Sequence, residues 1–258
     1  MAKRNENGMS AKNKEWGFTE ASLPRSHKGS ETGVLICHGF GGTPDNMRCL
    51  FDAAVDAGYS TYMPLLSGHA RTLADMDACS LSDWRKDADS AYGELRAMGV
   101  KKIFLCGLSM GSLLMADLAA RRKGDERIAG LMLICPPVKM KLYLRLLALV
   151  SPACPFILTR DTFESKTTEI YCGTATKKLR DLIKLGGIVK NEAERISSPT
   201  LLIMAGRDDR VSKRSFAILM KRIKCAEIVL VPEAPHGITY SPYKDEVVRL
   251  MLERLERI

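Results

Sequence analysis

One pentapeptide carries the most specific chemical signal in the chain: Gly107-Leu108-Ser109-Met110-Gly111. An apolar run at 102–106 leads directly into it, and a helix is predicted to leave it. A tight turn between a strand and a helix, bounded by glycines, exposes the serine hydroxyl at the carboxyl edge of a sheet. The free N–H groups at the start of the helix point to the same place. Ser109 is therefore the candidate nucleophile, in preference to an ordinary capping serine.

A nucleophilic serine needs a general base, and the chain contains four histidines, His27, His38, His69 and His236. The first lies in a polar N-terminal arm, and the next two lie in loops that precede Ser109. Only His236 follows Ser109, in a loop between a predicted strand and the final predicted helix. A histidine in this position is best interpreted as the general base.

The third group should be a carboxylate that orients the imidazole and stabilises its protonated form. The loop at 205–211 follows a predicted strand and contains two neighbouring carboxylates, Asp208 and Asp209. Because adjacent side chains point apart, only one of them can face the histidine. We expect this residue to be Asp209, with Asp208 as the alternative. The other carboxylate would be solvated and paired with a neighbouring arginine.

The loop His38-Gly39-Phe40-Gly41-Gly42 follows the first clear strand. Its glycines allow the backbone to approach a reacting carbonyl group closely. The backbone N–H groups of Phe40 and Met110 are the natural pair of donors to an oxyanion. A phosphate-binding loop is a poor alternative, because the sequence has neither GxGxxG nor GxxxxGK[ST].

From Gly33 onward, strand-like and helix-like segments alternate along most of the chain. Strands are expected at 33–37, 59–63, 102–106, 129–135, 200–204 and 226–231, and helices are expected from Thr43, Ser82, Met110, Ser212 and Ser241. This alternation predicts an α/β protein with a mostly parallel sheet that is covered by helices on both faces.

The alternation breaks at 136–195, where we expect no clear strand and find many basic and bulky apolar residues. We interpret 136–195 as a small inserted cap, called the cap segment below. The core would comprise 31–135 and 196–258, and 1–30 would form an arm with room for an extra edge strand. Apolar residues of the cap segment fit either an acyl pocket or packing onto the core: Leu142, Leu144, Leu146, Leu147, Leu149, Phe156 and Ile157. The basic residues among them fit either a lipid-facing surface or a solvated helix.

Composition restricts the class of protein further. The 258 residues suffice for one large α/β domain, and 46% hydrophobic with 27% charged residues argues against disorder, collagen and a multispan membrane protein. The net charge of +9 fits nucleic acid, anionic lipid, an acidic substrate or merely a basic surface. A nucleic-acid partner is disfavoured, because the basic residues lack interleaved aromatic residues.

Targeting and cysteine signals favour a reducing compartment. The N-terminal residues lack the apolar core of a signal peptide. The most apolar stretch, 142–158, is short and interrupted by Arg145 and two prolines, which argues against a transmembrane helix. The eight cysteines show no zinc-binding spacing, and three of them lie within predicted buried strands. We therefore expect a cytoplasmic protein without a metal or a cofactor.

Together these motifs resemble the α/β-hydrolase superfamily: HGFGG at 38–42, Ser67-Gly68-His69, GLSMG at 107–111, GRDD at 206–209 and His236. The small cap and the HGF loop are similar to those of bacterial carboxylesterases and monoacylglycerol lipases. The resemblance extends from about Gly33 to the C-terminus, apart from the cap segment. One small departure is Ser112, where these esterases often carry a second glycine.

The resemblance implies a nucleophile at Ser109, a base at His236, an acid at Asp209 and oxyanion donors at Phe40 and Met110. It implies hydrolysis of short- to medium-chain acyl esters or monoacylglycerols through an acyl-enzyme, without a cofactor. Lipid contact through the cap segment is a further expectation. Acyl transfer, or hydrolysis of a C–C bond or an amide, could use the same triad. A non-catalytic binding module is a distant alternative, since such a module would be expected to lack a triad member.

Overall fold

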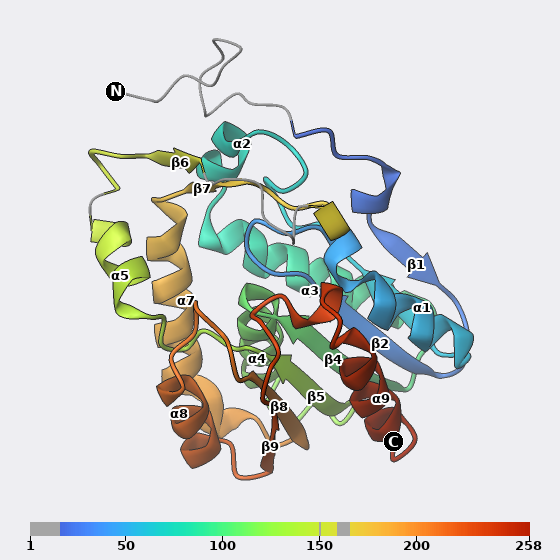
Figure 1. Ribbon diagram of the computed structural model, residues 1–258. Helices are drawn as coiled ribbons and strands as arrows, with labels where there is room; N and C mark the ends of the chain where they lie inside the picture. The colour runs from blue at the N-terminus through green and yellow to red at the C-terminus, as the bar shows by residue number, and fades with distance from the viewer. Residues whose placement is uncertain (1–15, 150, 159–165) are drawn as a thin grey trace.

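A seven-stranded sheet crosses the molecule in the strand order β1-β3-β2-β4-β5-β8-β9 (Figure 1). The computed structural model describes residues 16–149, 151–158 and 166–258. The strands are β1 (Arg25–His27), β2 (Thr32–Cys37), β3 (Ser60–Met63), β4 (Lys102–Leu108), β5 (Ile128–Ile134), β8 (Thr200–Ala205) and β9 (Ala226–Val231). Strands β2, β3, β4, β5, β8 and β9 run parallel to one another. The predicted α/β class and the mostly parallel sheet are confirmed.

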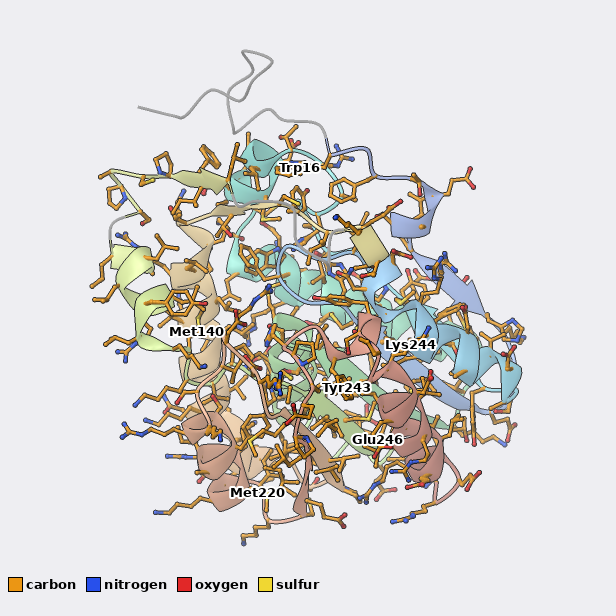
Figure 2. All side chains as sticks on the ribbon, in the orientation of Figure 1. Trp16, Met140, Met220, Tyr243, Lys244 and Glu246 are labelled. Carbon is orange, nitrogen blue, oxygen red and sulfur yellow. The ribbon has the colours of Figure 1, made fainter. Side chains whose placement is uncertain are left out.

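The central strands are continuous apolar runs because both faces of the sheet are covered. Alternate residues of each strand enter different cores, as the two-residue period of a strand requires. In β2, for example, Leu35 packs into one core, while Val34 and Ile36 pack into the other. Figure 2 shows the side chains that fill the spaces between the sheet and its helices.

Two groups of helices supply these cores. The first core receives α3 (Leu81–Ala97), α4 (Met110–Arg121), α7 (Lys178–Glu192) and α8 (Arg214–Arg222). The second core receives α1 (Arg48–Asp56) and α9 (Lys244–Leu255). Helices therefore cover both faces of the sheet, as predicted (Figure 1).

Local capping explains where several helices begin. Ser80 and Asp83 form a reciprocal capping box at the start of α3. The helix expected from Thr43 starts as a 3₁₀ turn (Pro44–Met47) and continues as α1. A further short helix, α2 (Leu73–Ala78), was not predicted, although Thr72 and Asp75 form the same capping box. Six residues are too few for a helical period to stand out in the sequence.

The described parts of the cap segment contain α5 (Leu142–Leu149), β6 (Phe156–Leu158), β7 (Gly173–Ala175) and α7. Strands β6 and β7 form a small antiparallel sheet, so the expectation of no strand in this segment was wrong. Each strand has three residues, which is too short for an alternating pattern to be recognised. Helix α7 packs against α4, so the end of the cap segment joins the helix layer of the sheet.

The arm contributes an edge strand, because β1 pairs antiparallel with β3. Glu169 ties the arm to the rest of the molecule: its carboxylate accepts hydrogen bonds from the side chains of Thr19 and Ser22. The backbone of Glu169 in turn bonds Asp45 and Thr43, beside the glycine loop at 38–42. Within the described residues, none of the helices has the length and apolar character needed to span a bilayer.

Candidate active site

Ser109 lies between the end of β4 and the start of α4 in an uncommon backbone conformation, with φ 54° and ψ −117°. A non-glycine residue in such a region costs about 1–3 kcal/mol and persists only where its surroundings impose it. Here the surroundings are close backbone contacts. A Cβ on Gly111 would lie 2.2 Å from the carbonyl oxygen of Cys37, and a Cβ on Gly107 would lie 2.4 Å from the backbone of Gly111. Only glycine fits at these two positions, as the pentapeptide predicts.

His236 is held by a carboxylate from the loop that follows β8. Its Nδ1 lies 2.7 Å from Oδ2 of Asp208, and the two side chains are only 5% and 6% exposed. The other carboxylate oxygen accepts the backbone N–H groups of Arg210 and Val211, each at 2.8 Å. Burial alone would raise the pKa of Asp208, but the hydrogen bond and charge of His236 and these two N–H groups hold it below its ordinary value. Asp208 is therefore a buried, ionised partner for the imidazole.

The choice of Asp209 over Asp208 was wrong. The side chain of Asp209 is 75% exposed, and its Oδ1 lies 3.8 Å from Nε of Arg210. The reason is local: the Asp208 carboxylate accepts N–H groups two and three residues ahead, which is an Asx-type turn that fixes it inward. Asp209 then points outward and pairs with an arginine, as expected for the residue that does not face the histidine. In the sequence, the indication was that Asp208 comes first in the turn, where an aspartate commonly accepts backbone N–H groups of the residues that follow.

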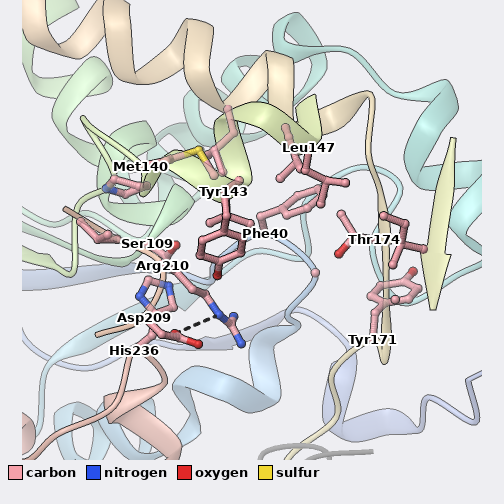
Figure 3. Close-up of a pocket in the computed structure, with 18 of the residues that line it drawn as sticks. Phe40, Ser109, Met140, Tyr143, Leu147, Tyr171, Thr174, Asp209, Arg210 and His236 are labelled. Atoms are coloured by element: carbon pink, nitrogen blue, oxygen red, sulfur yellow. Dashed lines mark ion pairs between the residues drawn. The ribbon is translucent and has the colours of Figure 1, made fainter. Parts of the chain in front are cut away.

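Ser109 and His236 line the same cavity, which has a volume of about 340 Å³ (Figure 3). Phe40 and Gly41 of the glycine loop line it as well. Three of the apolar residues singled out in the cap segment also line it, namely Leu144, Leu147 and Ile157. Three others, Leu142, Leu146 and Leu149, are exposed on the outer side of α5. The cap segment therefore supplies both a cavity wall and an exposed apolar face.

The backbone N–H groups of Phe40 and Met110 are the donors that the sequence predicts for an oxyanion, and both residues belong to segments that meet at Ser109. The loop packs directly against Ser109, because a Cβ on Gly39 would lie 3.3 Å from the Ser109 Cβ. The N–H of Gly41 donates to His69 at 3.2 Å, whereas that of Phe40 has no acceptor in the described part of the chain. Met110 opens α4, where first-turn N–H groups have no partner within the helix. Phe40 and Met110 therefore remain the predicted oxyanion donors.

Two buried histidines fix the shape of this loop. His38 donates from Nδ1 to the carbonyl of Gly39 (2.9 Å) and accepts the N–H of Leu66 (3.1 Å). His69 donates from Nδ1 to the carbonyl of Ser67 (3.1 Å) and accepts the N–H of Gly41. Burial lowers the pKa of His38 to about 3 and that of His69 to about 4. Both rings are therefore neutral positioning groups, a role that sequence reasoning did not assign to them.

A cysteine lies beside the imidazole–carboxylate pair. Donor atoms of Cys135, Asp208 and His236 all lie within 4.8 Å of one another, a set of residue types that can bind zinc. However, the 2.7 Å between Nδ1 and Oδ2 is a hydrogen-bond distance. Two ligands on one tetrahedral zinc with bonds of about 2.0–2.2 Å would be roughly 3.4 Å apart. The present spacing fits a shared proton better than a shared metal.

The neutral histidines predict a pH-dependent stability. In the unfolded chain each ring takes up a proton below about pH 6.5, whereas folded His69 does so only near pH 4. The free energy of unfolding should therefore fall as pH decreases from about 6.5 to 4, because the unfolded state binds more protons. The His69→Gln variant keeps an acceptor for Gly41 but does not titrate, so its slope should be smaller by about 1.4 kcal/mol per pH unit. Urea unfolding at several pH values measures this slope, and an unchanged slope in the variant would contradict a neutral His69.

The chain is similar to known lipases and esterases. The chain is 28% identical over 232 residues to a thermostable monoacylglycerol lipase of Bacillus sp. (strain H-257), covering 86% of this chain and 89% of that protein. It is 26% identical over 248 residues to a carboxylesterase of Bacillus subtilis (strain 168), covering 91% and 96%. A solved structure of metagenome-derived lipolytic enzymes, LipS and LipT, matches with a TM-score of 0.85 and 28% identity, over 93% of this chain and 99% of that one.

Residues 29–242 match the family described as serine aminopeptidase, S33. This span includes the strained serine turn, the Asp208 loop and His236. The resemblance to α/β-hydrolases expected from the motifs is confirmed, and the chain belongs to the serine aminopeptidase S33 family of serine hydrolases.

Proposed function

We propose that this protein hydrolyses carboxylic esters through an acyl-enzyme on a triad of Ser109, His236 and Asp208. The observation that carries this proposal is the buried His236–Asp208 pair, which shares a site with a serine held in a strained turn. Asp208 takes the place that the sequence had suggested for Asp209. The names of the two Bacillus relatives support an ester as substrate.

The hydrogen bond to Asp208 sets the direction of proton transfer. With Nδ1–H donated to the carboxylate, Nε2 of His236 is left as the acceptor for the Ser109 hydroxyl proton. The serine oxygen bonds to the ester carbonyl carbon, and the oxyanion accepts the N–H groups of Phe40 and Met110. The imidazolium gives its proton to the leaving alkoxide as the C–O bond breaks. His236 then takes a proton from water, whose oxygen bonds to the acyl carbon. As the bond from that carbon to the Ser109 oxygen breaks, the imidazolium returns the proton to Ser109 and the acid is released.

The two adjacent aspartates give the most specific test of this triad. Asp208→Ala should lower kcat/KM for p-nitrophenyl butyrate by about 10⁴, because the imidazole loses its orientation and its counter-charge. Asp209→Ala, the matched control, should change it less than about threefold, since an exposed ion pair is worth under about 1 kcal/mol. Ser109→Ala should lose the activity. Equal losses at the two aspartates, or activity that survives Ser109→Ala, would refute the assignment.

The cavity favours an apolar acyl group over a peptide. The residues that line it are mostly aliphatic or aromatic and include Phe40, Met140, Tyr143, Leu144, Leu147, Ile157, Leu179 and Leu182. Among the described residues, Asp209 is the acidic residue that lines it, and this side chain pairs with Arg210 rather than offering a site for a peptide amine. A volume of about 340 Å³ lies at the small end of ligand pockets. Short- to medium-chain acyl esters or monoacylglycerols are therefore the proposed substrates.

Filling the cavity should shift the preferred chain length. Leu147 lines the cavity, whereas its neighbour Leu146 is 53% exposed on the outer side of α5. We expect butyryl and octanoyl esters to react faster than palmitoyl esters. Leu147→Trp should reduce kcat/KM for the octanoyl ester about tenfold relative to the acetyl ester, because pocket methylenes contribute about 1–3 kcal/mol. Leu146→Trp is the control and should leave the ratio unchanged. A substrate panel in which both variants behave alike would contradict an acyl pocket at this wall.

The outer side of the cap segment fits a lipid surface that carries such substrates. Helix α5 exposes four large apolar residues: Leu142 (65%), Tyr143 (52%), Leu146 (53%) and Leu149 (69%). A hollow beside the start of α5 is lined by five cationic residues: Lys139, Lys141, Arg145, Lys213 and Arg214. None of the five has an acidic ion-pair partner within the described ranges. Nζ of Lys141 bonds the backbone carbonyl of Asp208, so the other four cations are the ones that border the apolar side chains and suit an interface with anionic lipid.

This proposal predicts a localised effect on vesicle binding. The double variant Leu142→Ser/Leu149→Ser should bind vesicles of phosphatidylglycerol and phosphatidylcholine at least about a hundredfold more weakly, because each exposed leucine would lose about 1.5 kcal/mol or more of burial. The control is Ile228→Ser/Leu230→Ser on β9, where the side chains are 40% and 48% exposed. Sedimentation with vesicles gives the comparison. Equal binding by the two double variants would show that α5 is not the contact.

We also propose a cytoplasmic, reducing environment for the protein. All eight cysteines are free thiols in the structure, including buried Cys37, Cys106 and Cys135. A chain of this size that builds its own core does not need disulfides for stability. The proposed mechanism requires neither a metal nor a cofactor, because the oxyanion, the nucleophile and the base are all supplied by protein groups.

A further inference from the structure

Hydrogen bonds between neighbouring peptide groups set the direction of the Phe40 N–H in the glycine loop. The Gly42 N–H donates to the carbonyl oxygen of Gly39 at 3.2 Å. This carbonyl and the Phe40 N–H belong to one planar peptide group, in which the N–H points away from the oxygen. Three of the five residues at 38–42 are glycines, whose backbone is conformationally free and needs support from outside the loop. The direction of the predicted oxyanion donor therefore depends on what holds Gly42.

The cap segment supplies this support. The backbone N–H of Tyr171 donates to the carbonyl oxygen of Gly41 at 3.0 Å. The peptide group between Gly41 and Gly42 thus accepts from Tyr171 at its oxygen and donates to Gly39 at its nitrogen. Hydrogen bonds linked in this way strengthen one another in a buried environment. Only one peptide group separates Tyr171 from the peptide that carries the Phe40 N–H.

The Tyr171 side chain is fixed as well. Its hydroxyl accepts the backbone N–H of Arg71 at 2.7 Å and donates to the backbone carbonyl of Arg71 at 2.8 Å. The residue is only 6% exposed, and burial raises the pKa of its phenol well above the ordinary value, so the hydroxyl keeps its proton and remains a donor. Arg71 lies two residues after His69, whose ring accepts the Gly41 N–H. The phenol therefore ties the cap segment to the loop that holds the other side of Gly41.

The arm packs against the same tyrosine. The Phe18 ring lies 4.8 Å from the Tyr171 ring at 65°, and the Trp16 ring lies 5.5 Å from it at 68°, both edge-to-face arrangements that aromatic pairs favour. Tyr171 also lines the cavity together with Phe40 (Figure 3). The arm, the cap segment and the glycine loop thus all contact the cavity or its lining at Tyr171.

We propose that Tyr171 is a positioning residue for the Phe40 oxyanion donor. Its phenol holds the cap segment in register with Arg71, and its backbone N–H then holds the peptide group between Gly41 and Gly42. This inference rests on the proposed function, because an oxyanion forms only when Ser109 attacks a carbonyl carbon. It goes beyond that function by giving a residue of the cap segment a part in the alignment of the donor.

The Tyr171→Phe variant tests the role of the phenol, since it keeps the ring and the backbone N–H and removes only the hydroxyl. An oxyanion donor acts in the transition state, so kcat for p-nitrophenyl butyrate should fall about tenfold while KM stays within about twofold. This loss is a part of the roughly 10²–10³-fold cost of removing an oxyanion donor altogether. Tyr92→Phe is the matched control and should leave kcat unchanged. Tyr92 is also buried, its hydroxyl donates to Asp125 at 2.7 Å, and it is not among the described residues that line the cavity.

A trifluoromethyl ketone with a butyl chain gives a second measurement. The Ser109 oxygen adds to the ketone carbon, the serine proton passes to His236, and the oxygen of the adduct takes the place of the oxyanion. The inhibition constant should therefore rise about tenfold in Tyr171→Phe and stay unchanged in Tyr92→Phe. Phe18→Ala, which removes one aromatic neighbour of Tyr171, should lower kcat and raise the inhibition constant by smaller factors.

Hydrogen exchange separates this inference from the proposed function. Amide exchange in a peptide covering 38–47 should be faster in Tyr171→Phe than in the wild-type protein or in Tyr92→Phe. If exchange is faster but the wild-type protein has no Ser109-dependent esterase activity, the proposed function is refuted and the link from Tyr171 to the glycine loop is supported. Unchanged exchange in this peptide, or a raised KM with unchanged kcat, would overturn the positioning role and leave Tyr171 as a cavity wall.

Discussion

The close approach of backbone to backbone at Gly107 and Gly111 is the constraint on which the rest of the site depends. Strand β4 and helix α4 meet so closely that no side chain fits at either glycine, and the residue between them is forced to φ 54°. The contact with Cys37 and His38 also places the end of β2 directly beneath the turn. Since the glycine loop follows β2 and the serine follows β4, the pairing of these two strands brings Ser109 and the glycine loop together. The parallel register of β2 with β4, from Thr32 with Lys102 to Cys37 with Gly107, is what makes the approach possible.

A second constraint holds the acid side of the site. The loop after β8 pairs with the stem of the cap segment, since Met140 bridges Val211, the N–H of Lys141 donates to Arg210 and the N–H of Ser212 donates to Lys139. Lys141 also bonds the carbonyl of Asp208. The same stem leads into α5, which forms one wall of the cavity. Asp208 is therefore hydrogen-bonded, through the stem, to the helix that carries the cavity wall and the exposed apolar face. A displacement of α5 would change the position of the Asp208 loop.

The sequence predicted most of the framework because the framework is repetitive. Long apolar strands and periodic helices fix the α/β class, and the serine turn is recognisable since its glycines are required sterically. The choice between Asp208 and Asp209 failed because it depends on a turn: two backbone N–H groups bond Asp208, and no periodicity reports them. The roles of His38 and His69 were missed for a similar reason, as their partners lie across space at Leu66 and Gly41. Strands β6 and β7 and helix α2 were too short to produce a pattern.

Peptide-level mass spectrometry of a trapped adduct tests most directly whether Ser109 becomes covalently modified as the nucleophile. The wild-type protein would be treated with a fluorophosphonate, or with a p-nitrophenyl ester whose acyl-enzyme is hydrolysed slowly. It would then be digested, and the modified peptide would be identified. We predict one adduct of the expected mass on Ser109, formed at a rate that depends on His236 and Asp208. An adduct on another residue, such as a cysteine thiol, or turnover of esters without any adduct on Ser109, would contradict the account.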